Sequence, residues 1–326
     1  MGSNPAGGTP PGALATAENY RRFAALEAAG RSRAYEVLAY AVAEDRAVLS
    51  FLELLPPPKR QPNLLFAAAR HLVGAPPTIS TLRSLVSDRP GQLAQVMAAR
   101  RTQTNEVARC AVLLPALVEL PPPLALLEVG AAAGLTLLPD VYSYDYEGHE
   151  VVGTDPLAPT LRCRARGLAR LPVSVPEVAW RAGIDLNPLD LGNDDDMVWL
   201  ACLVWPGEED RAERLEAAVA TARRHPPAVY QGDLLDDLAK VAAGAPAGPT
   251  LVVYHSAALA YVDETKRRSF AAAVQELGAV WLSNEGSGVL PVTGATAGPG
   301  DFLIVRDGKQ VLARADPHGT WLHWLA

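Results

Sequence analysis

The chain has 326 residues, of which 49% are hydrophobic and 20% charged, and its net charge is −7. This is the composition of a globular protein with a full core, and the interspersed acidic and basic residues exclude a nucleic-acid-binding surface. The apolar runs are too short to span a bilayer, so no membrane partner is expected. The cysteines, Cys110, Cys163 and Cys202, are odd in number and form no C-x-x-C pair, which predicts reduced, buried thiols in a cytoplasmic protein without a zinc site.

Residues 1–16 have neither a basic start nor an apolar centre, and we expect a disordered tail rather than a signal peptide. Residues 17–123 are expected to form a helical N-terminal domain that serves as a lid. Within it, apolar residues at helical spacing predict three helices, each followed by a run of prolines: 33–55, 63–73 and 91–119. The last proline run, Pro121-Pro122-Pro123, is the expected domain boundary.

From residue 124 onward short apolar runs alternate with helix-like stretches, which predicts an α/β domain over 124–326. Its sheet is expected to be mostly parallel and covered by helices on both faces. The strands are expected at 124–129, 178–184, 228–230, 250–254, 280–283, 302–305 and 311–315, and the helices at 195–203, 210–224, 234–243 and 264–277. The last two strands form an antiparallel hairpin around Asp307-Gly308. Residues 142–146 and 160–166 alternate in side-chain character, as a two-stranded ribbon does. We expect 140–176 to be an insertion between the first helix and the second core strand.

The first strand runs into a glycine turn in the stretch "LLEVGAAAGLTLL", Leu126–Leu138, which predicts a strand, a tight turn and a helix. In an open parallel sheet this turn is the usual ligand cradle. The dinucleotide fingerprint would need glycines where Ala132 and Leu135 stand, and the phosphate loop would need a lysine after its second glycine. Neither nucleotide-phosphate interpretation fits.

The turn instead resembles the first motif of class I S-adenosylmethionine-dependent methyltransferases, acidic-x-Gly-x-Gly-x-Gly, with Ala132 at the middle glycine. The resemblance implies a Rossmann-like class I methyltransferase sheet. It also implies that the turn contacts S-adenosyl-L-methionine through Glu128, Gly130, Ala131 and Gly134.

Such a fold needs acidic residues at the ends of the next strands. Asp185, in "WRAGIDLNP", ends the second strand and would hold the ribose hydroxyls. Asp155, about twenty residues past Gly134, is the alternative. Asp233, in "VYQGDLLDDL", follows the third strand and suits the adenine amino group. Each of these acids can also be an ordinary helix cap.

Longer segments resemble the actinobacterial proteins grouped as domain of unknown function 2332, from about Tyr20 to Pro291. The segments are "RQPNLLFAAARHL", "RRTQTNEVARC", "LLEVGAAAGLTLL", "EVAWRAGIDLNPLDL", "CLVWP" and "VVYHSAALAYV". The resemblance implies a methyltransferase-like fold with an N-terminal helical part. Thr136 stands where the family pattern has asparagine, so no side-chain role is carried over to it.

Two polar segments admit two interpretations each. The block Arg100–Glu106 is either a solvated turn inside a long helix or lies beneath the end of the first strand. In the second case Asn105 and Arg109 would reach the methionyl carboxylate, for which a guanidinium is suited. Similarly, Arg60-Gln61-Pro62-Asn63 either caps the next helix or projects into the cleft.

Three residues are candidates for the chemistry. His255, at the end of the fourth strand, is either a general base that deprotonates a substrate hydroxyl or a buried core histidine. Tyr261 contacts substrate or packs. Glu285, after the fifth strand, binds substrate or is an ordinary loop acid.

The expected function is therefore S-adenosylmethionine-dependent methyl transfer to a small-molecule acceptor, at oxygen and without a metal. One alternative is a regulatory module that keeps the methyltransferase fold and binds S-adenosylmethionine or a nucleoside without turnover. Another is a nicotinamide-dependent oxidoreductase, which lacks its fingerprint. The sequence leaves the acceptor and the oligomeric state open.

Overall fold

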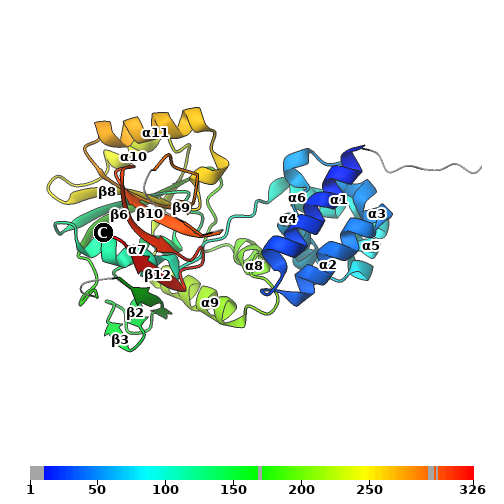
Figure 1. The fold of residues 1–326 in the computed structure, drawn as a ribbon, viewed down its shortest axis with the longest axis horizontal. Helices are drawn as coiled ribbons and strands as arrows, with labels where there is room; N and C mark the ends of the chain where they lie inside the picture. Colours follow the sequence, from blue (N-terminus) through cyan, green and yellow to red (C-terminus); the bar gives the residue numbers. More distant parts are fainter. Residues whose placement is uncertain (1–10, 168–170, 293–296, 299) are drawn as a thin grey trace, which may run out of the picture. The chain divides into compact units, whose positions relative to one another are not determined.

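A computed structural model describes residues 11–167, 171–292, 297–298 and 300–326 of the chain (Figure 1). The chain divides into two compact units. The helical unit consists of Met1–Thr104 and Asp195–Glu213, and the α/β unit consists of Asn105–Asp194 and Arg214–Ala326. The division therefore falls near residue 104 rather than at the prolines 121–123, and a second segment from the middle of the chain belongs to the helical unit.

The helical unit contains more and shorter helices than the apolar spacing predicts. Its elements are α1 (Pro11–Phe23), a π-helical turn η1 (Ala24–Ala28), α2 (Arg33–Glu44), α3 (Arg46–Glu53), a 3-10 turn η2 (Pro57–Lys59), α4 (Pro62–Val73), α5 (Ile79–Asp88) and α6 (Pro90–Ala99), with most of α8 (Asp194–Cys202) and the start of α9 (Glu209–Arg224).

Two of the expected helices are broken, and part of the expected tail is helical. The helix expected at 33–55 stops at Asp45, whose carboxylate accepts a hydrogen bond from Val48 N at 3.0 Å and so caps α3. The helix expected at 91–119 ends with α6, and 100–106 is not helical. Residues 11–16, expected in the tail, begin α1, and Thr16 donates a hydrogen bond to Glu53 at 2.7 Å. Residues 1–10 lie outside the described residues.

The α/β unit contains a nine-stranded sheet in the order β5-β12-β11-β10-β9-β8-β1-β6-β7. Its strands are β1 (Leu124–Val129), β5 (Arg164–Arg166), β6 (Val178–Asp185), β7 (Ala228–Gln231), β8 (Thr250–Ser256), β9 (Val280–Gly286), β10 (Phe302–Arg306), β11 (Gln310–Ala315) and β12 (Trp321–Trp324). The strands β7, β6, β1, β8 and β9 are parallel, and β9 to β12 are antiparallel neighbours. The expected mixed α/β architecture with a mostly parallel sheet and a terminal hairpin is confirmed.

The five parallel strands reverse their order in the middle of the sheet. In chain order they lie third, second, first, fourth and fifth, so the reversal falls between β1 and β8. In open α/β sheets ligands bind beyond the carboxyl ends of the strands at such a switch point. A ligand-binding site is therefore expected at the turns that follow β1 and β8.

The glycine turn does not lead into an α-helix. It is followed only by a 3-10 turn, η3 (Leu135–Leu137). Pro139 prevents a longer helix, and the hydroxyl of Tyr142 donates a hydrogen bond of 2.7 Å to the carbonyl oxygen of Leu135. A small sheet then follows, with β3 (His149–Val151), β2 (Ser143–Tyr146) and β4 (Thr160–Arg162) side by side, whereas β5 pairs with β12. The expected ribbon is thus three-stranded and follows a turn, not a helix.

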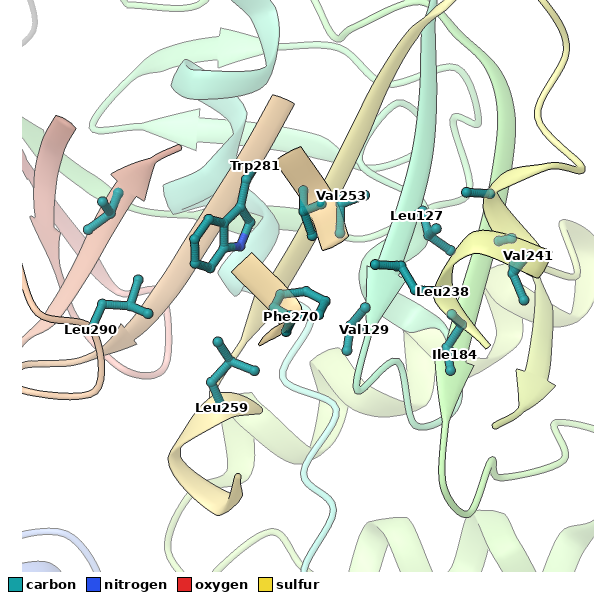
Figure 2. Close-up of a cluster of buried hydrophobic side chains, with 14 of the residues drawn as sticks. Leu127, Val129, Ile184, Leu238, Val241, Val253, Leu259, Phe270, Trp281 and Leu290 are labelled. Atoms are coloured by element: carbon teal, nitrogen blue, oxygen red, sulfur yellow. The ribbon is translucent and has the colours of Figure 1, made fainter. Parts of the chain in front are cut away.

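Helices cover both faces of the large sheet. Figure 1 shows α10 (Leu238–Ala242) and α11 (Glu264–Glu276) on one face and α7 (Arg109–Val118) on the other. A further 3-10 turn, η4 (Leu259–Tyr261), follows β8. Under α10 and α11 the strands bury Leu127, Val253 and Trp281 against Phe270 (Figure 2). Because β1 is buried along its whole length, it reads in the sequence as a continuous apolar run rather than an alternating one.

Candidate functional site

The turns that follow β1 and β8 touch at the switch point. A β-carbon added at Gly130 would lie 2.7 Å from the β-carbon of Ala258. Each turn also holds an alanine in the left-handed region, Ala132 with φ of 50° and Ala257 with φ of 55°. Such backbone strain in non-glycine residues is concentrated at functional sites, so two strained turns in contact mark a candidate site.

The glycines of the β1 turn are required by the packing of the chain itself. Gly134 has φ of 74°, and a β-carbon there would lie 2.6 Å from Pro227. The turn also packs on the neighbouring strand, where a β-carbon at Gly183 would meet that of Ala131 at 2.5 Å. Ala131, Gly134 and, through its contact with Ala258, Gly130 are therefore explained by the fold, and Gly130 is in addition exposed at the switch point.

Asp185 lies where the sequence analysis places it, at the end of β6 beside the β1 turn. Its carboxylate accepts hydrogen bonds from Ala132 N and Asn187 N, both at 2.8 Å, and only 7% of the residue is exposed. The carboxylate thus holds the strained Ala132 in place.

The alternative, Asp155, lies in the loop between β3 and β4. It pairs with Arg224 at 2.8 Å and with His225 at 3.1 Å. The amide of Leu157 and the guanidinium of Arg224 lower the pKa of Asp155 to about 2. Asp155 therefore anchors a loop, and its carboxylate is used by Leu157, Arg224 and His225.

Asp233 follows β7, and its loop reaches Asp185 because Gly232 N donates to the carbonyl of Asp185 at 2.9 Å. Its carboxylate is paired with Lys266 at 2.5 Å and accepts Leu235 N at 2.9 Å. Burial alone would raise the pKa of Asp233, but these partners outweigh it and the pKa is lowered. Asp233 is near the site, and its carboxylate is used to fix the loop.

A buried polar network lies beneath the β1 turn. Asn105 accepts Leu135 N at 2.8 Å and donates to the hydroxyl of Thr136 at 3.4 Å, and Thr136 donates to Glu128 Oε1. Burial raises the pKa of Glu128 to about 8, against the opposing effect of the Thr136 hydrogen bond. Oε2 of Glu128 is buried without a hydrogen-bond partner in the described part of the chain. Thr136, to which the sequence assigned no role, thus links the turn to a carboxyl group whose pKa is raised by burial.

Arg109, on α7, is buried and also serves the switch point. Its guanidinium donates to the carbonyl of Ser256, the last residue of β8, at 3.2 Å and to that of Pro317 at 2.8 Å. Asn105 and Arg109 therefore lie close to the ends of β1 and β8, as expected, and both hold backbone there.

The other polar segments belong to the helical unit. Arg100 is paired with Asp195 and Asp196 of α8. Arg60 donates two hydrogen bonds of 3.0 Å to the carboxylate of Glu53 and one of 2.8 Å to Leu55 O. Both arginines are thus used within the helical unit. Residues 100–106 do not form a turn of helix, and Arg60 holds the end of α3 rather than capping α4, whose N-cap residue Gln61 makes no capping hydrogen bond with its side chain.

His255 is completely buried in β8, and both of its ring nitrogens are used. Nδ1 lies 2.7 Å from Glu285 Oε1, and Nε2 lies 2.9 Å from the indole nitrogen of Trp281. An indole nitrogen only donates, so Nε2 accepts and the ring proton is on Nδ1. With 0% of its surface exposed, His255 has no nitrogen with which to take a proton from a substrate. The geometry corresponds to the buried core histidine and not to the general base.

Glu285 is part of β9 rather than of the loop after it. Oε1 accepts Nδ1 of His255 and also the amides of Ala258 and Leu259, at 2.8 and 2.9 Å. These hydrogen bonds lower the pKa of Glu285 further than its burial raises it. Tyr261, by contrast, is 78% exposed on η4. Of the three chemical candidates only Tyr261 is open to a substrate in this conformation.

The described ranges contain neither a metal-binding cluster nor a membrane-spanning helix. Within 11–167, 171–292, 297–298 and 300–326, no group of three or more His, Cys, Asp or Glu side chains is placed to hold a metal ion. The helices in those ranges include none with the length and apolar character needed to cross a membrane.

The fold and the site define an α/β protein with a mostly parallel sheet, a strained switch point and a separate helical unit. The chain belongs to the family described as uncharacterized proteins conserved in bacteria, domain of unknown function 2332, whose pattern matches residues 17–324. No match was found among curated proteins or among solved structures.

Proposed function

We propose that the α/β unit has a Rossmann-like class I methyltransferase fold, binds S-adenosyl-L-methionine at the switch point and transfers its methyl group to an oxygen of a small-molecule acceptor. The order of the parallel strands carries this proposal, because it puts the glycine turn after β1 where the order reverses. Two further features support the proposal. The carboxylate of Asp185 at the end of β6 can accept hydrogen bonds from ribose hydroxyls, and β10 lies antiparallel beside β9, as expected for a methyltransferase-like sheet with a C-terminal hairpin.

The residues present fit such a cofactor in two respects. Gly130 is exposed, so backbone without a side chain is available to an approaching ligand. Asp185 supplies an acceptor-only carboxylate for hydroxyl donors within one hydrogen bond of the same turn.

The sulfonium of the cofactor supplies an activated methyl group, and the protein has to align the acceptor and exclude water. Since His255 has no free nitrogen, an acceptor oxygen that is already ionised, such as a carboxylate oxygen, suits this site better than a hydroxyl. Tyr261, exposed directly after the β8 turn, is the side chain best placed to contact the acceptor.

The burial of His255 also favours a second candidate function, a regulatory module that binds S-adenosylmethionine or a nucleoside without turnover. The strand order and the turns are equally compatible with a regulatory module. Such a module needs no general base, which agrees with the burial of His255 in β8.

Calorimetry with the full chain tests the proposal. We expect S-adenosylmethionine and S-adenosylhomocysteine to bind and NADH not to bind. If neither adenosyl compound binds, both candidate functions are wrong. If both bind but a panel of carboxylate and hydroxyl acceptors shows no methyl transfer, the regulatory module is the better description.

A further inference from the structure

A small cavity lies between β9 and β10, on the face of the sheet covered by α11. It is lined by Ser283 and Glu285 of β9 and by the apolar side chains of Leu290, Val292, Leu303 and Val305. Ser283 is the cross-strand partner of Val305, and Glu285 is that of Leu303. The space inside it, with its open side, is about 180 Å³, and its enclosed part has room for one group the size of a water molecule.

Two polar side-chain atoms of residues that line this cavity have no hydrogen-bond partner among the described residues. Glu285 Oε2 and Ser283 Oγ are both buried without a hydrogen bond to any described residue, and the two residues are 2% and 1% exposed. A buried acceptor left without a donor is costly, and buried polar groups are nearly always satisfied. Both atoms therefore call for a ligand that donates hydrogen bonds.

The carboxylate of Glu285 has no fixed cation among its hydrogen-bond partners in the described part of the chain. Glu285 Oε1 accepts three hydrogen bonds, one from His255 and two from backbone amides, and these favour the ionised carboxylate. All three donors are neutral, because the contact with Trp281 leaves His255 a single ring proton. A buried carboxylate is normally paired with a cation, and here no cation comes from its hydrogen-bonded neighbours.

We propose that this cavity binds a primary ammonium group carried on a small alkyl body. The ammonium has three N–H donors, of which one meets Glu285 Oε2 and one meets Ser283 Oγ. It has the size of a water molecule and brings the missing positive charge. The alkyl body contacts Leu290, Val292, Leu303 and Val305. A hard metal ion is a poorer occupant, because it takes six or more oxygen ligands and the cavity offers two.

The site reaches the switch point through one residue. Glu285 Oε1 accepts a hydrogen bond from Ala258 N, and Ala258 packs on Gly130. The ammonium site nevertheless does not rest on methyl transfer, and its test uses no cofactor.

The test measures binding of n-propylammonium chloride to the full chain by NMR titration and by thermal melting. We expect saturable binding with a dissociation constant on the order of millimolar, as suits a ligand with so few atoms. Tetramethylammonium chloride, which has the same charge and no N–H donor, should not bind. Ammonium chloride should bind at least tenfold more weakly, because it lacks the apolar contacts.

Variants separate the site from general salt effects. Glu285→Gln keeps an oxygen for the three hydrogen bonds to Oε1 but replaces Oε2 by a donor, and it should weaken binding at least tenfold. Ser283→Ala should weaken it several-fold and covers the case in which Glu285→Gln does not fold. Ser269→Ala, at an exposed serine of α11, is the matched control and should bind as the wild type does. Equal effects of propylammonium and tetramethylammonium, equal affinity for ammonium and propylammonium, or full affinity in Ser283→Ala would each overturn the proposal.

Discussion

The indole nitrogen of Trp281 donates a hydrogen bond to Nε2 of His255 at 2.9 Å, across the two neighbouring strands β9 and β8. This contact fixes the tautomer of His255 and directs its proton to Glu285. Glu285 in turn holds the amide of Ala258, which packs on Gly130. A core hydrogen-bond chain thus runs from the interior of the sheet to the switch point.

The first prediction concerns this chain. Replacing His255 by alanine leaves the indole N–H unpaired in the interior, removes one of the three hydrogen bonds to Glu285 Oε1 and creates a cavity. We expect the free energy of unfolding to fall by roughly 2–4 kcal/mol. Urea denaturation measures the change. His323→Ala, at an exposed histidine, is the control and should change it by less than about 0.5 kcal/mol.

A His255→Ala variant with unchanged stability would contradict the packing role. If the variant also lost methyl transfer while remaining fully folded, His255 would have to reach substrate in another conformation.

The burial of His255 shows why the strands were easier to predict than the site. The parallel strands are buried on both faces, so they appear as apolar runs that need no knowledge of their partners. Whether His255 has a free ring nitrogen depends on Trp281, which lies on another strand. Alternation along β9 does place Trp281, Ser283 and Glu285 on one face, and that signal was available in the sequence.

The errors in the helices have two causes, one local and one that depends on the complete fold. The helix expected after the glycine turn is prevented partly by the hydroxyl of Tyr142, which takes the carbonyl of Leu135. The segment Asp195–Glu213 belongs to a helical unit formed mainly by a distant part of the chain. The first of these contacts joins residues only seven apart, on either side of Pro139, so that error is local. The second association cannot be inferred from local spacing, because only the complete fold brings the two segments together.

The second prediction concerns the contact between the two turns. In Gly130→Ala the new β-carbon meets Ala258 and the backbone is held at φ of 77°, so both a clash and strain oppose folding. We expect a loss of roughly 1–3 kcal/mol in the free energy of unfolding. Adding Ala258→Gly removes the clash but not the strain and should restore part of the loss.

Gly278→Ala is the matched control for strain. Its φ is 65°, and nothing lies within 4 Å of an added β-carbon. Gly278→Ala should lower the free energy of unfolding less than Gly130→Ala does. The difference between the two losses should equal the amount that Ala258→Gly restores in the Gly130→Ala background. Purely additive effects of Gly130→Ala and Ala258→Gly would show that the two turns do not press on each other. Gly130 substitutions are consequently poor probes of cofactor binding, because they act on the fold as well.

The third prediction is a pH dependence. The pKa of Glu128 is about 8 in the folded chain, against roughly 4.3 in an unfolded one. Between these two pH values Glu128 is protonated in the folded state and ionised in the unfolded state. The contribution of this group to the free energy of unfolding is therefore fully present below the lower pKa and is lost as the pH rises towards 8. Glu128→Gln keeps an acceptor for Thr136 and cannot ionise. The difference in unfolding free energy between variant and wild type should therefore grow from about pH 5 to pH 8 and then level off. Glu150→Gln, at an exposed glutamate, should show no such trend, and a flat difference for Glu128→Gln would disprove the raised pKa.

The last prediction separates the two candidate ribose acids. Asp185 borders the strained Ala132, whereas Asp155 is paired with Arg224 in the loop between β3 and β4. If S-adenosylmethionine binds at the switch point, Asp185→Ala should weaken its affinity by roughly 10- to 100-fold, because ribose hydroxyls lose a charged acceptor. Asp155→Ala should leave the affinity within about twofold. Both changes remove partners of backbone amides, so the titrations are made under conditions where circular dichroism shows each variant folded. Asp185→Asn keeps an oxygen for the Ala132 amide but no charge, and it distinguishes the two duties of this carboxylate. Recovery of stability without recovery of affinity assigns the charge to the ligand, and recovery of both assigns Asp185 to the turn alone.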